Sequence, residues 1–164
     1  MMNQIKAAPI SHEAIAPYGA LVNLVDPKGF SLDGALHRFF PDRVMVYSED
    51  DFAFSPLEVK KPEKMIIDAM EMHELADEII LPLDDDVVIH VAPTTPGKPD
   101  TLKAEAFLVP QGTLVKLNRG VWHLAPLPVH KPAVHVMIGL PQRTYALDCE
   151  VVPLEASKQF EIVL

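Results

Sequence analysis

The residues most able to do chemistry lie in two short stretches of the chain. Glu71, His73 and Glu78 follow one another closely, and His123 comes about 45 residues later, at the end of Gly120-Val121-Trp122-His123. Two imidazoles and two carboxylates form a ligand set that suits a hard-to-borderline divalent metal ion. We therefore predict a metal site made of Glu71, His73, Glu78 and His123. The identity of the ion stays open among Ni, Mn, Fe and Zn.

A β-strand over residues 65–73 would position the first of these groups. Side chains along a strand alternate between its two faces. The alternation puts Glu71 and His73 on one face, together with the apolar side chains of Met65, Ile67 and Ala69. We therefore expect a packed core that runs directly into the site.

Each of these residues also has a purely structural interpretation. His73 and His123 can be buried histidines without a ligand, and Glu71 can be a metal ligand, a general base or an exposed glutamate at a barrel rim. Glu78 is a good ligand candidate, because an uncompensated buried carboxylate is costly. Arg119 either holds a substrate carboxylate with two parallel hydrogen bonds or points outward. Our catalytic candidates are Glu71, His73, His123 and Arg119.

Three further residues are candidate members of a pocket. His90 and His135 stand inside apolar strand-like segments, where a lone histidine is either a satisfied core residue or a pocket group. Trp122 should mainly pack in the core, with a second role as one wall of the pocket. If both histidines point inward, the pocket holds up to four imidazoles.

Composition excludes several classes of protein. The formal net charge is −9 and the basic residues are scattered, which argues against nucleic-acid binding. Cys149 is the single cysteine, so no internal disulfide can form. No stretch reaches the roughly 18 apolar residues of a membrane helix, and the first twenty residues do not resemble a secretion signal. We therefore expect a cytoplasmic protein that acts on a small molecule.

The chain is divided into many short segments. It has 16 prolines against 7 glycines in 164 residues, and proline favours strand edges and turns. A helical turn should follow Ser11, which is a good N-cap. The remaining pattern predicts one all-β domain over residues 1–164, a barrel or sandwich with little helix. The expected strands are 4–10, 20–25, 44–47, 65–73, 87–91, 104–109, 113–117, 134–138 and 160–164.

The last of these strands also bears on assembly. Phe160-Glu161-Ile162-Val163-Leu164 is apolar and could add to the sheet of a second copy. A homodimer is therefore the expected state.

The motifs resemble a known family. Glu71-x-His73-x4-Glu78 with Gly120-x-x-His123 resembles the two metal motifs of cupins, which are double-stranded β-helix or jelly-roll barrels. More narrowly, the chain resembles the ureidoglycolate lyase family of allantoin degradation and purine catabolism, over about residues 4–153. The matching elements occur in the family's order: Pro9-Ile10-Ser11, Pro17-Tyr18-Gly19, Glu71-x-His73, Ile80-Leu81-Pro82-Leu83, Val91-Ala92-Pro93, Lys98-Pro99-Asp100, Ala106-Phe107 and Arg119-Gly120-Val121-Trp122-His123.

The departures from the family pattern fall in the site itself. The family usually has Arg, Pro, Gln and His where this chain has Met72, Glu74, Glu78 and Leu124, and an Asp-Arg pair where it has Gly139-Leu140. It also places apolar residues at the positions of His90 and His135. The chain thus resembles a divergent member with a changed substrate on a retained scaffold.

The resemblance implies a metal-dependent lyase or hydrolase of a small carboxylated, ureido-type molecule. For ureidoglycolate itself, the products would be glyoxylate and urea. Two alternatives stay open: a cupin isomerase or oxygenase, which suits a histidine-rich pocket with iron or manganese, and a cupin that only binds a small molecule. Metal content separates the binding protein from the enzymes, and oxygen uptake separates the oxygenase from the lyase.

Overall fold

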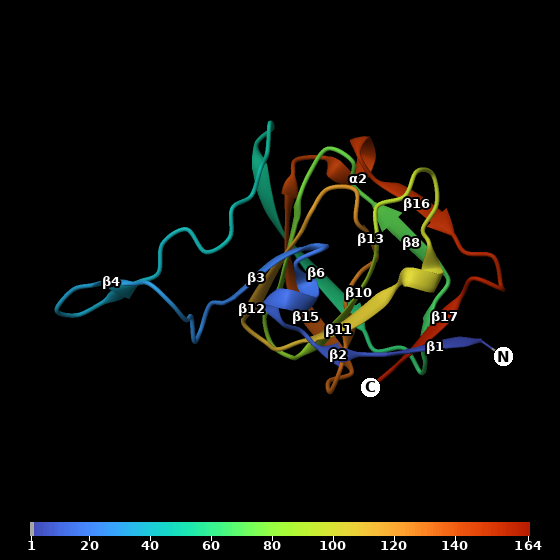
Figure 1. Cartoon of the computed structure of the whole chain (residues 1–164), viewed down its shortest axis with the longest axis horizontal. Helices are drawn as coiled ribbons and strands as arrows, with labels where there is room; N and C mark the ends of the chain where they lie inside the picture. The colour runs from blue at the N-terminus through green and yellow to red at the C-terminus, as the bar shows by residue number, and fades with distance from the viewer. Residues whose placement is uncertain (1) are drawn as a thin grey trace.

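Two β-sheets packed face to face form the body of the protein (Figure 1). The computed structural model describes residues 2–164. The seven-stranded sheet contains β2 (Ala8–Pro9), β8 (Ala69–Met72), β10 (Val87–Ala92), β11 (Glu105–Val109), β13 (Trp122–His123), β14 (Leu127–Pro128) and β16 (Glu150–Pro153). The five-stranded sheet contains β3 (Gly19–Asn23), β6 (Phe52–Lys60), β9 (Glu78–Pro82), β12 (Thr113–Leu117) and β15 (Ala133–Pro141). The all-β prediction is confirmed.

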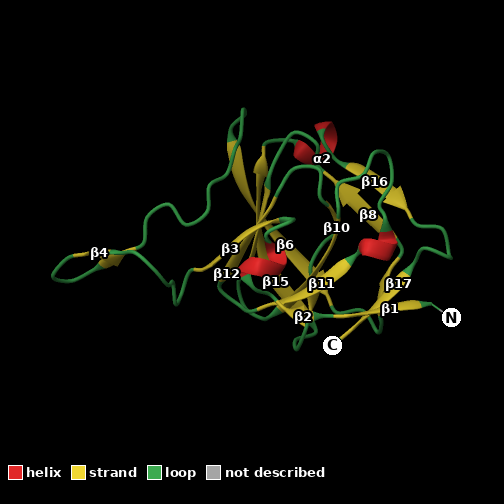
Figure 2. Cartoon of the chain, in the orientation of Figure 1, coloured by secondary structure: helices red, strands yellow, loops and turns green. Residues whose placement is uncertain are grey.

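A third, three-stranded sheet covers the outer face of the seven-stranded sheet. It consists of β1 (Asn3–Lys6), β17 (Phe160–Val163) and β7 (Met65–Ile67), in that order. A small hairpin of β4 (Leu32–Asp33) and β5 (Arg38–Phe39) stands apart from all of them. The helices are single turns, coloured red in Figure 2: α1 (His12–Ile15), α2 (Thr144–Leu147) and the 3-10 turn η1 (Thr101–Lys103). No helix among the described residues has the length and apolar character needed to cross a membrane.

The central strand β10 shows why the body has two cores. All six of its residues are buried, so neither face of the strand meets water. Val87, Ile89 and Val91 point into the inner core, between the seven- and five-stranded sheets. Val88 and Ala92 point into the outer core, beneath the three-stranded sheet. Alternation along one strand therefore fills both cores.

The predicted continuous strand over residues 65–73 is wrong. β7 ends at Ile67 and β8 begins at Ala69, and the two strands belong to different sheets. The outer core contains four side chains of this segment: Met65, Ile67, Met70 and Met72. The buried positions are thus odd-numbered before the exposed Asp68 and even-numbered after it. The apolar side chains of this segment therefore point away from Glu71, and the inner face of β8 is left for the polar groups.

Most of the other expected strands occur, although residues 4–10 are divided between β1 and β2, which belong to different sheets. β3, β10, β11, β12 and β15 confirm the predicted segments, and the Ser11 side chain caps α1 by accepting from the N–H of Ala14 at 3.1 Å. Residues 44–47 form no strand; they lie in an extended arm. The C-terminal strand β17 is paired on both sides, with β1 and β7, so it has no free edge to offer a second copy. The reason given above for a dimer is therefore wrong.

His90 lies in the outer core and not in a pocket. On β10 it shares the face of Val88 and Ala92, and its ring centroid is 6.2 Å from that of Phe160. The side chain is fully buried, and neither ring nitrogen has a hydrogen-bond partner. Burial, followed by the nearby positive charge of His123, lowers the pKa of His90 to about 3. The imidazole is therefore neutral in the folded protein at physiological pH.

This buried neutral imidazole should make folding stability depend on pH. Below about pH 6.5 the unfolded chain gains a proton at His90 that the folded chain cannot accept, so stability falls as pH falls. His90→Leu removes this loss of folding stability at low pH. We expect its stability relative to the parent protein to rise by about 2 kcal/mol between pH near 7.5 and pH near 5. Urea unfolding in the presence of a chelator measures the difference. Val88→Ala, on the same face, should shift stability equally at both pH values, and an equal shift for His90→Leu would contradict the neutral state.

Candidate metal centre

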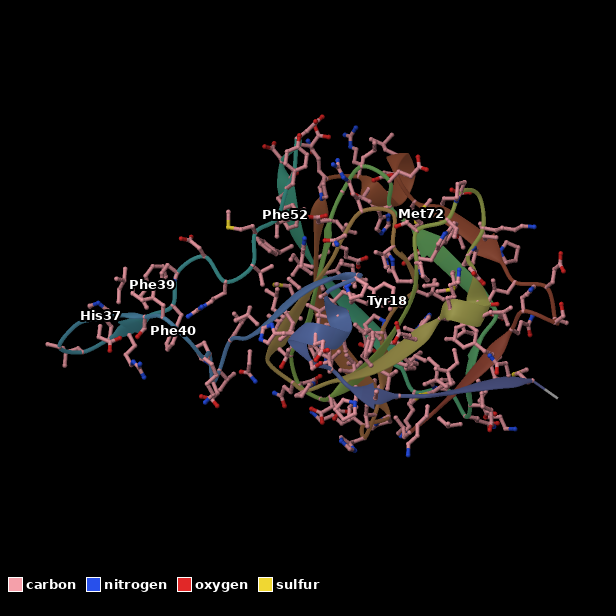
Figure 3. All side chains as sticks on the ribbon, in the orientation of Figure 1. Tyr18, His37, Phe39, Phe40, Phe52 and Met72 are labelled. Atoms are coloured by element: carbon pink, nitrogen blue, oxygen red, sulfur yellow. The ribbon has the colours of Figure 1, made fainter. Side chains whose placement is uncertain are left out.

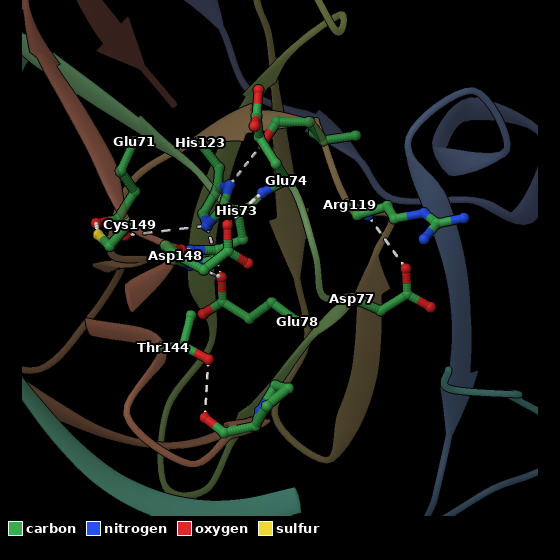
Figure 4. Close-up of polar contacts among 12 residues, drawn as sticks. Glu71, His73, Glu74, Asp77, Glu78, Arg119, His123, Thr144, Asp148 and Cys149 are labelled. Atoms are coloured by element: carbon green, nitrogen blue, oxygen red, sulfur yellow. Dashed lines mark hydrogen bonds and ion pairs between the residues drawn. The ribbon is translucent and has the colours of Figure 1, made fainter. Parts of the chain in front are cut away.

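Strand pairing brings the two predicted motifs together. Glu71 on β8 lies directly opposite His123 on β13. His73 follows β8, and its carbonyl accepts from the N–H of Gly120 at 2.6 Å. Gly120 has a φ of +81°, a conformation that glycine adopts without strain. Glu78 begins β9 in the opposing sheet. Four residues from two sheets thus meet at one end of the inner core (Figure 4).

The backbone fixes the orientation of both imidazoles. The Nδ1–H of His73 donates to the carbonyl of Asp148 at 2.6 Å, and that of His123 donates to the carbonyl of Val121 at 2.9 Å. A carbonyl can only accept, so each Nδ1 must carry the proton. The Nε2 atoms are then free to bind a metal ion, which is the usual arrangement for metal-ligating histidines.

The donor atoms converge without satisfying one another. One atom each from Glu71, His73 and His123 lie within 4.8 Å of one another. Oε2 of Glu78 is 2.5 Å from Nε2 of His123 and 3.5 Å from Nε2 of His73. Even so, Oε2 of Glu78 and Nε2 of His123 are buried and lack a partner in hydrogen-bond geometry. A buried nitrogen and a buried carboxylate oxygen without hydrogen-bond partners are suitable ligand atoms for a divalent metal ion.

The pKa values of Glu78 and His123 also favour a bound cation. Burial alone would raise the pKa of Glu78, but the charges of His123 and His73 lower it to about 2. Burial alone would lower the pKa of His123, but the Glu78 carboxylate raises it to about 9. Without a metal, the two groups therefore form an imidazolium–carboxylate pair. A divalent cation can take the place of the proton that the pair retains.

A segment that the sequence did not single out forms one wall of the site. The carboxylate of Asp148 accepts from the N–H groups of Glu74 at 2.8 Å and Leu75 at 2.9 Å, while its carbonyl holds His73. Thr144 of α2 is buried, and its hydroxyl donates to the carbonyl of Pro141 at 2.8 Å. Asp148 lies about 75 residues after His73, and nothing in its local pattern distinguishes it from a loop aspartate.

Cys149 contacts the site as a thiol. Its Sγ donates to Oε2 of Glu71 at 3.4 Å. Burial and the Glu71 charge raise the pKa of the Cys149 thiol to about 11. The group therefore stays protonated at neutral pH and is a hydrogen-bond donor to Glu71, not a thiolate ligand.

Arg119 lies outside the cluster. Its side chain is exposed, and its guanidinium lies over the ring of Tyr47, 5.7 Å from the centroid. The backbone N–H of Arg119 donates to Asp77 at 3.1 Å. The side chain lines a cavity of about 210 Å³ that Asp148 and Thr144 also line. Glu71, His73, Glu78 and His123 do not line this cavity, and Asp148 is the residue that links it to the cluster.

The structure does not bring the other three candidates to the site. His135 is exposed, because Val134 and Val136 occupy the inner face of β15, and its Nδ1 lies 2.8 Å from Oδ2 of Asp84. Trp122 is fully buried in the outer core, where its indole N–H donates to the carbonyl of Thr95 at 3.1 Å. His90 lies in the same outer core. Trp122 thus packs in the core as expected, and the alternative that His90, His135 or Trp122 lines a pocket at the site finds no support, because strand alternation turns each of them to the opposite face.

The pairing of Glu78 with His123 can be tested in metal-depleted protein. Glu78→Gln keeps the shape of the side chain but removes its charge, so the pKa of His123 should fall from about 9 to below about 7. An NMR titration of the imidazole signals measures this directly. Glu74→Gln removes an exposed carboxylate from the same loop and should leave the His123 titration unchanged. An unchanged His123 pKa in Glu78→Gln would show that the carboxylate does not stabilise the imidazolium.

Comparison with solved structures concerns the fold. A dTDP sugar isomerase from Desulfovibrio desulfuricans G20 superposes with a TM-score of 0.52 at 12% identity, over 87% of this chain and 89% of that one. The likeness confirms the all-β cupin fold. At this identity it carries no information on the reaction.

Comparison with sequences identifies the family. A family model described as ureidoglycolate lyase matches residues 2–161. The ureidoglycolate lyase of Rhodobacter capsulatus is 26% identical over 141 residues, which cover 84% of this chain and 86% of that protein. The ureidoglycolate lyase of Escherichia coli K12 is 24% identical over 123 residues, which cover 73% of this chain and 77% of that protein. Because the family match spans nearly the whole chain and includes the site described above, the protein belongs to the ureidoglycolate lyase family.

Proposed function

We propose that the protein is a metal-dependent lyase of a small carboxylated, ureido-type substrate, and that it cleaves ureidoglycolate or a close analogue. Membership of the family supports the lyase reaction. The observation that carries the metal dependence is the buried convergence of Glu71, His73 and His123 with the unpartnered oxygen of Glu78.

His73 and His123 would hold the ion, with Glu78 as a carboxylate ligand and Glu71 either as a second one or as the general base. When bound, the ion would supply Lewis-acid chemistry that lowers the pKa of a substrate hydroxyl. The imidazole rings need no reorientation for this role, because backbone carbonyls already hold their Nδ1–H groups. The Nε2 atoms of His73 and His123 are therefore preorganised to bind the ion.

Glu71 is the best candidate for moving a proton. Its carboxylate is the most exposed of the four acidic and basic groups, with 23% of the side chain accessible, against 8% or less for the others. As a base it would take the proton of the substrate hydroxyl while the C–O bond becomes a carbonyl and the C–N bond breaks. The electron pair of that bond goes to nitrogen, and Glu71 can return the same proton there. Glyoxylate and urea leave without any other reactant.

Arg119 would bind the substrate's carboxylate in the cavity that Asp148 also lines. Its guanidinium is the positive group on the cavity beside the site, and two parallel hydrogen bonds to a carboxylate suit its planar shape. The acidic Glu49, Asp50 and Asp148 line the same cavity. The combination favours a substrate with a carboxylate at one end and N–H donors at the other, as in a ureido acid.

Elemental analysis and a urea-release assay on the same untagged preparations test the proposal. The parent protein should hold about one divalent ion per chain, and both His73→Ala and His123→Ala should lose the ion and at least about 100-fold in activity. His135→Ala removes an exposed histidine and should retain both.

Three results would contradict the proposal. Retained activity in His73→Ala or His123→Ala would refute the site. A parent protein without metal, even after incubation with divalent ions, would favour a cupin that only binds its ligand. Oxygen uptake with a suitable substrate in place of urea release would favour an oxygenase.

A further inference from the structure

An extended arm leaves the body between β3 and β6 and returns beside the cavity that Arg119 lines. It comprises residues 24–51 and contains the isolated β4–β5 hairpin (Figure 1). In Figure 3 the ring of Phe39 lies far out on the arm, whereas Phe52 marks the place where the chain has rejoined the body. Glu49, in the returning half of the arm, lines the cavity of about 210 Å³ together with Arg119. The arm therefore supplies part of the cavity wall.

The carboxylate of Asp77 holds the returning end of the arm. Only 12% of this side chain is accessible, and it accepts three hydrogen bonds. The donors are the backbone N–H of Tyr47 at 3.4 Å, the backbone N–H of Arg119 at 3.1 Å and the ammonium group of Lys116 at 3.4 Å. Figure 4 shows the bond between Arg119 and Asp77. One carboxylate therefore joins the arm to the turn that carries Arg119.

The side chain of Tyr47 contacts two charged residues of the cavity in different ways. The guanidinium of Arg119 lies over the face of the Tyr47 ring, and its distance of 5.7 Å from the centroid is within the range of a cation–π interaction. The Tyr47 hydroxyl donates to Oε1 of Glu49 at 2.7 Å. A single side chain thus holds a cation on its ring and an anion on its hydroxyl.

Arg119 and Glu49 carry opposite charges and line the same cavity, yet they do not pair with each other. In the described part of the chain, no carboxylate forms an ion pair with the Arg119 guanidinium. A free guanidinium can form two parallel hydrogen bonds with a carboxylate from outside. An ion pair with Glu49 would occupy the same N–H donors. The contacts that keep these two side chains apart therefore keep Arg119 available to a ligand.

We propose that Tyr47 is a positioning residue for substrate binding: its ring holds the Arg119 guanidinium in the cavity, and its hydroxyl keeps Glu49 away from that guanidinium. This inference rests on the proposed function, in which Arg119 binds the carboxylate of a ureido acid. The arm thereby contributes to the preference for an acid over an uncharged analogue. Because Tyr47 acts through Arg119 and Glu49, its effect falls on binding affinity and not on the chemical step.

Hydantoic acid (N-carbamoylglycine) is a suitable probe. It keeps the ureido group and the carboxylate of ureidoglycolate but lacks the hydroxyl, so the proposed reaction cannot cleave it. Its amide has the same ureido end without the negative charge. Calorimetric titration of the purified, untagged protein with both compounds measures the preference for the acid. The parent protein should bind the acid at least about tenfold more tightly than the amide, because hydrogen bonds between charged groups are the strong ones.

Variants of Tyr47 and Arg119 test whether the two residues act together. Tyr47→Leu removes the aromatic face, so the acid should bind about fivefold more weakly while the affinity for the amide stays unchanged. Arg119→Ala should weaken binding of the acid at least about tenfold. The double variant should bind the acid no more weakly than Arg119→Ala alone, because Tyr47 acts through Arg119. Tyr145→Leu is the matched control, because Tyr145 is 83% exposed and does not line the cavity. It should bind both compounds as the parent protein does.

Tyr47→Phe tests the role of the hydroxyl separately. The ring face remains, but Glu49 is released and can pair with Arg119, so the acid should bind about threefold more weakly. Glu49→Gln in the Tyr47→Phe background removes the competing charge and should restore the affinity of the parent protein. An affinity that is not restored would refute the competition between Glu49 and the ligand.

Three results would overturn the inference about Tyr47. The first is a parent protein that binds the acid and the amide equally well. The second is a Tyr47→Leu variant that binds the acid as tightly as the parent protein, or that loses affinity for the acid and the amide alike, as a general disturbance of the fold would cause. The third is a double variant in which the two losses multiply, which would show that Tyr47 acts independently of Arg119.

The proposed reaction fails in a different way, because the titrations require no turnover. If the affinities are as expected but the parent protein releases no urea from ureidoglycolate, the reaction is wrong and the role of Tyr47 stands. If urea is released, Tyr47→Leu should raise KM about fivefold and leave kcat unchanged. An unchanged KM would leave the reaction in place and overturn the role of Tyr47.

Discussion

The buried pair of Glu78 and His123 is the constraint on which the rest of the site depends. Each charge alone would be very costly in the inner core, and together they are still poorly satisfied by hydrogen bonds. The fold tolerates the pair because one residue comes from each sheet, so the sheets must face each other for either group to be neutralised. A cation at this place would resolve the deficit, and the surrounding backbone already orients the groups toward it.

Much of this arrangement follows from local sequence patterns. Strands such as 87–91 and 113–117 were predictable, because unbroken apolar or alternating runs leave few other options. The convergence of Glu71, His73, Glu78 and His123 followed from their residue types and from the family motifs. The errors have a common physical cause: alternation tells which residues share a face, but not which sheet a strand joins. Asp68 moves the chain to a different sheet, and the inner or outer orientation of His90 and His135 depends on sheets that assemble from distant segments.

Distance along the chain explains the remaining omissions. Asp148 and Cys149 approach the site only because β16 pairs with β8, and their local sequence gives no sign of that pairing. The apolar character of the C-terminal strand was correctly recognised, yet its hydrogen bonds are used within the chain. The residues of the arm contain little regular structure, so no periodicity indicated that their apolar side chains lie outside the core.

The position of Asp148 has a consequence for exchange with solvent. The segment from Pro141 to Glu150 closes one side of the site, and Asp148 links it to the loop that follows His73 through three hydrogen bonds. Through its carbonyl, Asp148 anchors the ring of His73, whose Nε2 would bind the ion. Loosening of this segment would therefore free the His73 ring to rotate, and would couple local opening of the segment to loss of the ion.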